Sequence, residues 1–223
     1  MVTVFDWHYA LQILPMLGQA SIITVEATVV SFAVAAVLGL AFAILRMVPA
    51  PAVAVPVSML VEAIRSTPLL IQIMFIYFGL PKLGIVIDAF PAGVMALGLH
   101  YATYCSEVYR AGLGAIPRGQ WEACIALNFS PADTMRKIII PQAIPPVVPA
   151  LGNYLIALFK DTPLLSAISV IELMQTARVI GSTNFRYVEP VTLVGALFLV
   201  FSLIAASGVR HVEAWLRSCR GEK

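Results

Sequence analysis

The chain has 223 residues, of which 60% are hydrophobic and only 12% are charged, whereas ordinary soluble domains carry about 25% charged residues. A soluble core cannot absorb that much apolar surface, so lipid must solvate most of this protein. The net charge of +2 is too small to indicate a nucleic-acid partner. Composition therefore favours a membrane protein and excludes a nucleic-acid-binding domain.

Apolar stretches along the chain predict an all-α membrane protein, because a helix of about 20 apolar residues crosses the hydrocarbon. We predict one domain over residues 1–223 with five transmembrane helices. The second stretch is interrupted only by Glu62 and Arg65, which lie three apart on one helical face and can pair. Residues 162–171 are too few for a sixth span and indicate a re-entrant or interfacial piece. The five predicted spans are residues 27–45, 55–80, 91–106, 142–159 and 190–209.

Basic residues predict the orientation, because Lys and Arg stay on the cytoplasmic side during insertion. With the N-terminus outside, nine basic residues fall in cytoplasmic segments and three in outer segments. We therefore expect the N-terminus outside and the C-terminus in the cytoplasm. The nine are Arg46, Arg110, Arg118, Arg136, Lys137, Arg210, Arg217, Arg220 and Lys223, and the three are Lys82, Arg178 and Arg186.

The longest polar interruption, residues 107–141, should form a cytoplasmic hairpin of two short helices. The first is predicted over residues 119–127, and Asn128 stands where a left-handed residue must reverse the chain. Ser130 can cap the second helix, with a proline at its first position and Asp133 three residues after the cap. The apolar side of this hairpin suits either a docking surface or packing against its own bundle.

The hairpin resembles the EAA loop of bacterial ABC import permeases, whose pattern is EAA, three residues, Gly, nine residues and I-x-L-P. The spacing here matches throughout, although Cys124, Asn128 and Ile140 replace Ala, Gly and Leu. In that family the loop is the coupling helix that docks into a groove on the ATPase subunit. The resemblance implies that Glu122 and Ala123 lie in the docking surface. The matching positions are Glu122, Ala123, Cys124, Asn128, Ile138, Ile139, Ile140 and Pro141.

Two further stretches are similar to permeases for polar amino acids. Residues 62–81 resemble the pattern E-x-x-R-G-T-P-L-L-x-Q followed by F-x-Y-F-G-L-P, with Ser66 in place of the usual Gly. Residues 152–164 resemble G-N-x followed by K-D-T-S-L, with Lys160 and Asp161 at the charged positions. All three matches occur in register within the half of the chain from residue 62 to 172.

The resemblance implies a type I ABC importer permease in the bacterial cytoplasmic (inner) membrane. Such a permease pairs with a copy of itself or a sister permease. A cytoplasmic ABC ATPase dimer drives the pair, and a periplasmic or lipid-anchored solute-binding protein delivers the solute. The chain itself should be no enzyme and hold no cofactor, because it lacks the GxxxxGK[ST] loop that cradles ATP phosphates. ATP and Mg²⁺ would be bound by the partner ATPase, and no metal site is predicted, since no HExxH motif is present.

Four charged residues are candidates for the translocation pathway, each with an ordinary alternative. Glu62 and Arg65 either close the inner end of the pathway or form an interfacial pair that reaches the lipid phosphates. Lys160 and Asp161 either meet the two charges of a zwitterionic solute or are boundary charges. Four tyrosines are expected to be packing or interface aromatics, or else to line the route: Tyr77, Tyr101, Tyr104 and Tyr154.

Two other functions are alternatives to an importer. A small ion-coupled secondary transporter would use Glu62 or Asp161 as its proton-coupling acid, but it leaves the hairpin unexplained. An intramembrane hydrolase needs a nucleophile beside a base, and the sequence indicates no such pair. Within the importer hypothesis, the cargo is a polar amino acid or an amino-acid-derived compatible solute such as ectoine.

Overall fold

The computed structural model describes residues 5–219, and every regular element within them is helical. The all-α prediction is therefore confirmed over this range, while Arg220 and Lys223 of the orientation argument lie outside it. The elements are α1 (Trp7–Met47), α2 (Pro51–Arg65), α3 (Leu69–Met74), a π-helical turn (Phe75–Gly79), a 3-10 turn (Leu80–Leu83), α4 (Ala89–Gly114), α5 (Arg118–Ala126), α6 (Pro131–Asp133), a second π-helical segment (Thr134–Ile139), α7 (Ile140–Asp161), a 3-10 segment (Thr162–Ile168), α8 (Leu173–Asn184) and α9 (Val188–Cys219).

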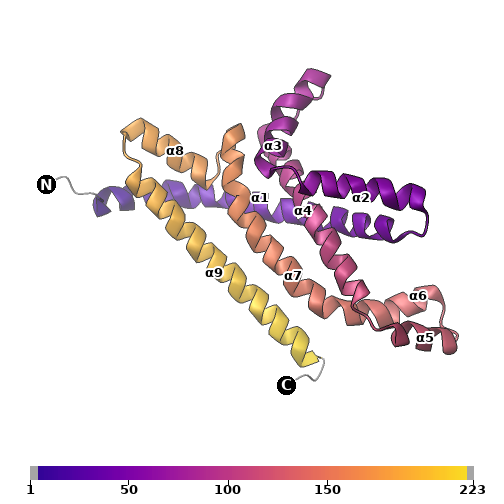
Figure 1. The fold of residues 1–223 in the computed structure, drawn as a ribbon. Helices are drawn as coiled ribbons and strands as arrows, with labels where there is room; N and C mark the ends of the chain where they lie inside the picture. The colour runs from indigo at the N-terminus through magenta and orange to yellow at the C-terminus, as the bar shows by residue number, and fades with distance from the viewer. Residues whose placement is uncertain (1–4, 220–223) are drawn as a thin grey trace.

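Helix α1 runs the length of the molecule, and α2 folds back beside it (Figure 1). Helices α4, α7 and α9 run obliquely to α1, and α7 packs on both α4 and α9. Helix α8 lies near the start of α1, whereas the hairpin of α5 and α6 projects from the opposite end (Figure 1). The bundle therefore has two distinct ends.

The fold contains fewer helices that could cross a membrane by length and apolarity than the five spans that the sequence predicts. Three helical runs are long and apolar enough to cross a membrane: α1, the run Pro131–Ile168, and α9 as far as Leu216. The bent pair of α2 with Leu69–Leu83 makes four if it counts as one span. Helix α4, which holds the predicted third span, is not among them. It lies inside the bundle and carries small and polar residues where lipid-facing helices carry apolar ones.

The predicted span over residues 55–80 is wrong as one straight helix. Helix α2 ends at Arg65, and the next helical segment leaves at a bend of 102°. The cause is Pro68, which disfavours helical geometry at Thr67 before it. The Gln72 side chain closes the break, since its amide donates to the carbonyl oxygens of Ile64 at 2.6 Å and of Thr67 at 3.1 Å.

The first predicted span, residues 27–45, begins twenty residues too late, because α1 starts at Trp7. Asp6 caps it by accepting the backbone N–H groups of His8 and Tyr9. With 41 residues the helix is roughly 60 Å long, about twice the hydrocarbon thickness. Such a helix must tilt strongly or project from the membrane.

The boundaries predicted for the loop over residues 107–141 also need correction. Helix α4 continues to Gly114, and the second arm of the hairpin is not a separate short helix, because α6 runs through Thr134–Ile139 into α7. The π-helical stretch comes just before Pro141, where a proline ring clashes with the carbonyl four residues earlier. The Ile140 N–H bonds to Met135 instead. One helical run therefore connects the hairpin to Asp161.

Helix α8 begins at a buried carboxylate that follows the predicted re-entrant piece. Residues Thr162–Ile168 form a 3-10 segment that ends at Ser169 with φ 60°. Glu172, fully buried, accepts the N–H groups of Met174 and Gln175. Burial raises the pKa of Glu172 to about 7, although those two hydrogen bonds lower it. The carboxylate thus fixes the start of α8 against the bundle.

Helices α1 and α4 approach so closely that only glycine fits at the crossing. A Cβ on Gly39 would lie 2.6 Å from Cys105 Cβ and 2.8 Å from the Ala102 carbonyl oxygen. A Cβ on Gly98 would lie 2.7 Å from Val34. Small residues at a helix crossing let the backbones touch, which is how membrane helices gain packing energy without a hydrophobic driving force.

Replacing Gly39 with alanine should therefore force α1 and α4 apart. Because the obstacle includes a backbone carbonyl that cannot move away alone, Gly39→Ala should lower the free energy of unfolding by about 1–3 kcal/mol. Gly18→Ala is the control, since no atom lies within 4 Å of its added Cβ. Thermal unfolding of the purified protein in detergent measures both. Equal midpoints for the two variants would contradict the close crossing.

Candidate functional site

The hairpin turn has the local geometry that its sequence predicts. Asn128 is left-handed with φ 53°. Its N–H bonds to the Ile125 carbonyl, and the Phe129 N–H bonds to the Cys124 carbonyl, as in a Schellman helix end. Ser130 then accepts the Asp133 N–H at 3.1 Å and caps the next helix. The left-handed turn and the serine cap are both confirmed, and α5 is shifted by only one residue from the predicted bounds.

The outer face of α5 exposes residues of the motif to solvent. Glu122 and Ala123 are exposed, whereas Cys124 is buried. Ile125 and Leu127 are 75% and 71% exposed, which is unusual for large apolar side chains on a loop. On the second arm Ile139 is fully buried, Ile138 is half-buried and Pro141 is exposed. The hairpin thus presents a mixed charged and apolar surface rather than burying it on its own bundle.

A cluster of charges joins three helices where α1, α2 and α4 meet. Glu107 of α4 accepts from Arg46 of α1 at 2.6 Å and from Arg110 at 3.3 Å, and Arg65 of α2 lies 3.8 Å away. The Arg46 side chain is only 11% exposed and also contacts the Ser58 and Ser106 hydroxyls. One carboxylate therefore lies within 4 Å of three guanidinium groups from three helices.

The sequence singled out Glu62 and Arg65 but missed Glu107. Glu62 pairs with Arg65 at 2.8 Å as its spacing predicts, yet its side chain is 61% exposed. Glu107 was treated only as the boundary of a loop. Its signal was topological: Arg46 and Glu107 follow the ends of the first and third predicted spans, so both must lie on the same side of the membrane. We name this set of Arg46, Glu62, Arg65, Glu107 and Arg110 the inner ion cluster.

Deeper in the bundle, Asp161 and a group of aromatic side chains connect α4 and α7. The Asp161 carboxylate accepts from the buried Tyr101 hydroxyl at 2.7 Å. The Tyr101 ring lies within 6.4 Å of Tyr154 and 5.8 Å of His100. Tyr104 completes the group, with its ring 5.3 Å from that of Tyr154. Three of the four tyrosines considered for the route therefore gather at the Asp161 contact, and Tyr77 is not among them.

Lys160 and Asp161 are neighbours in sequence, but the structure turns them in different directions. Asp161 bonds to α4, whereas Lys160 is exposed and lines a cavity of about 370 Å³ between α7 and α9 with Phe198 and Ser202. Adjacent residues on a helix point about 100° apart. The two charges therefore do not line a shared cavity in which one solute could contact both.

The segment after the break between α2 and α3 also contacts α4. Gln72 Oε1 lies 3.2 Å from His100 Nδ1. His100 and Glu107 are seven residues, or two turns, apart on α4 and so share one face. Through them, α4 contacts the segment after the break at Gln72 and the segment before it at Arg65.

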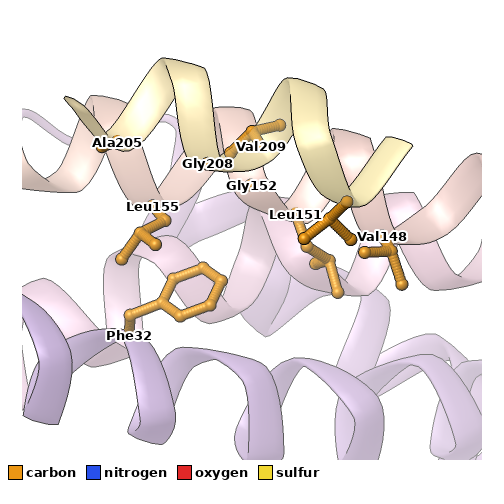
Figure 2. A pocket seen from close by; sticks show the side chains of 9 residues that line it. Phe32, Val148, Leu151, Gly152, Leu155, Ala205, Gly208 and Val209 are labelled. Atoms are coloured by element: carbon orange, nitrogen blue, oxygen red, sulfur yellow. The ribbon is translucent and has the colours of Figure 1, made fainter. Parts of the chain in front are cut away.

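A cavity of about 400 Å³ lies between α1, α7 and α9 (Figure 2). Figure 2 shows Phe32 of α1 directed toward the leucines of α7, with Gly208 and Val209 of α9 on the other wall. Every lining residue is apolar, so this cavity has nothing to bind the charges of a polar solute. Its lining residues are Phe32, Val148, Leu151, Gly152, Leu155, Ala205, Gly208, Val209 and Val212.

A helical membrane bundle with a cluster of charges at one end and a projecting hairpin is an arrangement that suits a membrane transport permease. Residues 35–218 match the family described as the binding-protein-dependent transport system inner membrane component. The chain belongs to this family, and its fold is that of a type I ABC importer permease. It is a transport subunit and not itself an enzyme.

Curated relatives agree along nearly the whole chain. A probable amino-acid ABC transporter permease, y4tG of Sinorhizobium fredii, is 45% identical over 92% of this chain and 89% of its own length. The arginine transport system permease ArtQ of Bacillus subtilis is 33% identical over 96% of this chain and 98% of its own. The predicted resemblance to permeases for polar amino acids is confirmed.

Solved structures show the same architecture. A structure of an amino acid ABC transporter with histidines superposes with a TM-score of 0.89 at 34% identity, covering 94% of this chain and 98% of that one. An inward-facing methionine transporter MetNI has a TM-score of 0.79 at 22% identity, covering 92% and 98%. The second likeness concerns the fold alone.

Removing the Glu107 carboxylate from the inner ion cluster should destabilise the bundle. Glu107→Gln leaves the nearly buried Arg46 without its counter-charge, and because Glu107 is about a third exposed, the loss should be moderate, about 1–3 kcal/mol in the free energy of unfolding. Glu62→Gln is the matched control and should change it by less than about 0.5 kcal/mol. Thermal unfolding in detergent compares the two. Equal midpoints for the two variants would show that the Glu107 contacts contribute nothing to the stability of the bundle.

Because Asn128 is left-handed, the hairpin should tolerate one substitution at this position and be disturbed by another. Asn128→Gly should preserve the hairpin, whereas Asn128→Val should destabilise it by about 1–2 kcal/mol, because a branched side chain clashes in this conformation. Hydrogen exchange of the amides over residues 118–128 measures this directly. If the valine variant exchanged as slowly as the glycine variant, the turn would not constrain the hairpin.

Proposed function

We propose that this chain is the permease of an ATP-driven importer and translocates a polar amino acid, or a compatible solute derived from one. One observation carries the proposal. The α5 face exposes Glu122, Ile125 and Leu127 at the register of the EAA loop. An exposed surface of apolar and charged side chains suits a protein partner better than water. Membership of the importer family makes a cytoplasmic ATPase that partner.

The proposal includes the membrane topology and the assembly. Five spans place the N-terminus outside and the hairpin and C-terminus in the cytoplasm, because nine basic residues then lie in cytoplasmic segments and three in outer segments. Two permeases, identical or homologous, pair in the bacterial inner membrane. An ABC ATPase dimer binds ATP and Mg²⁺ below them, and a periplasmic or lipid-anchored binding protein supplies the solute from outside.

The helical run from the hairpin into the bundle supplies a mechanism. One arm of the hairpin continues from Pro131 through the π-helical segment into α7, which ends at Asp161. A displacement of the hairpin by the ATPases therefore moves α7 relative to α4 and the contact of Asp161 with Tyr101. Alternating access then needs only two arrangements of the same packed helices, biased by nucleotide.

We assign the translocation pathway to the aromatic group around Asp161 and its inner end to the ion cluster of Glu62 and Arg65. Asp161 and the Tyr101 hydroxyl offer hydrogen-bond groups inside the bundle. Lys160 lines a different cavity, between α7 and α9. The cargo is an amino acid by analogy with the relatives named for amino-acid transport. Ectoine remains the compatible solute proposed as an alternative.

A secondary transporter driven by an ion gradient would not need the exposed α5 face. Uptake into liposomes separates the two functions. One set contains the permease, the ATPase and the binding protein and is supplied with ATP. A second set contains the permease without the ATPase and is given an ion gradient alone. An importer takes up labelled amino acid only when ATP is present on the side of the membrane where the ATPase is bound. Uptake on the gradient alone, without ATPase, would refute the proposal.

Glu122→Lys should uncouple the ATPase without unfolding the bundle. As an exposed residue it contributes within about 0.5 kcal/mol to stability, but a reversed charge at a docked surface can cost several kcal/mol. We expect the variant to reach the membrane normally, to co-purify with at least tenfold less ATPase, and to lose solute-stimulated ATP hydrolysis.

Lys82→Glu is the control, an exposed charge reversal on the 3-10 turn after α3, far from the hairpin (Figure 1). It should bind and stimulate the ATPase like the parent. If Glu122→Lys also did so, the hairpin would be an ordinary loop and the coupling role would fail.

A further inference from the structure

A third cavity lies away from the hairpin, and one carboxylate side chain lines it. Its volume is about 330 Å³, within the range of small-molecule sites. Glu26 of α1 is the single charged residue in its wall, and the other lining residues are Ile23, Ala89, Phe90, Val170 and Ile171. They come from α1, the start of α4 and the link between the 3-10 segment and α8.

Glu26 is unusual within its helix. It is the only Asp, Glu, Lys or Arg of α1 before Arg46. Within residues 5–219 its carboxylate makes no ion pair or hydrogen bond, whereas the carboxylates of Asp6 and Glu107 are both paired. An ionisable side chain on a membrane helix is costly and marks a functional site unless it has a partner.

The position of Glu26 along α1 fits a solute pathway. Twenty residues separate it from Arg46 of the inner ion cluster, which is roughly 30 Å of helix, or one hydrocarbon thickness. In the orientation proposed above, the cavity therefore opens at the outer boundary of the membrane. A solute released outside would meet this carboxylate before it reached Asp161.

The residues that line the Glu26 cavity indicate which kind of ligand it could bind. A divalent cation needs six or more oxygen ligands, and this cavity has one carboxylate. An organic cation needs a counter-charge and apolar or aromatic surface, and Phe90 supplies a ring beside Glu26. We infer that this cavity is an outer binding site for the positively charged nitrogen group of an amino acid or amine, with Glu26 as the counter-charge. This inference rests on the proposed import function.

The test measures binding to the permease–ATPase complex in lipid nanodiscs without a binding protein, with tritiated L-arginine as the probe. We expect saturable binding that Glu26→Gln weakens at least tenfold, because the amide keeps the size but not the charge. Glu26→Asp should recover part of the affinity. Asp88→Asn is the matched control and should stay within twofold of the parent, since Asp88 carries the same charge next to the cavity but does not line it.

Basal ATP hydrolysis and thermal unfolding should be the same for Glu26→Gln and the parent, which separates lost binding from lost structure. Equal arginine affinity of Glu26→Gln and the parent would overturn the inference, and so would the absence of saturable binding to the parent. Neither result affects the import function, because ATP-driven uptake by the reconstituted parent tests that separately.

Discussion

The contact between α1 and α4 is the constraint on which the rest of the structure depends. Gly39 and Gly98 let the two backbones meet so closely that Cys105 and Val34 fill the remaining space. In lipid, apolar side chains gain little from leaving their solvent, so this close packing must supply the association energy. With α4 held inside the bundle, its remaining faces are available to α2, α3 and α7. The polar residues of α4 then become contacts between helices.

Those contacts explain how one helix can support both a charged end and the solute pathway that we propose. Glu107 binds the arginines of α1 and α2, His100 meets Gln72 beyond the helix break, and Tyr101 reaches Asp161 at the end of α7. All three lie on a helix that the hairpin follows directly in sequence. The hairpin returns into α7, so α4 and α7 meet at the hairpin and again at Asp161. A movement of one relative to the other changes both places together.

Local chemistry made the hairpin predictable, because a left-handed Asn128 and the Ser130 cap follow from residues within one turn. The break at Pro68 was equally local, yet the apolar run around it concealed the bend. Glu107 and the orientations of Lys160 and Asp161 depend on which helices are neighbours, which a single sequence does not state. Glu26 was not considered as a site residue, because the predicted first span began after it at residue 27. A single charged residue in an apolar helix was nevertheless a signal for a functional position.

The central claim is that the α5 face lies in the cytoplasm and is covered by an ATPase. Ala123, exposed on that face, can be changed to cysteine after the three natural cysteines are replaced by alanine. A membrane-impermeant maleimide should label Ala123→Cys in inside-out vesicles and not in right-side-out vesicles, and bound ATPase should block the labelling. Labelling from outside, or labelling that the ATPase leaves unchanged, would contradict the account.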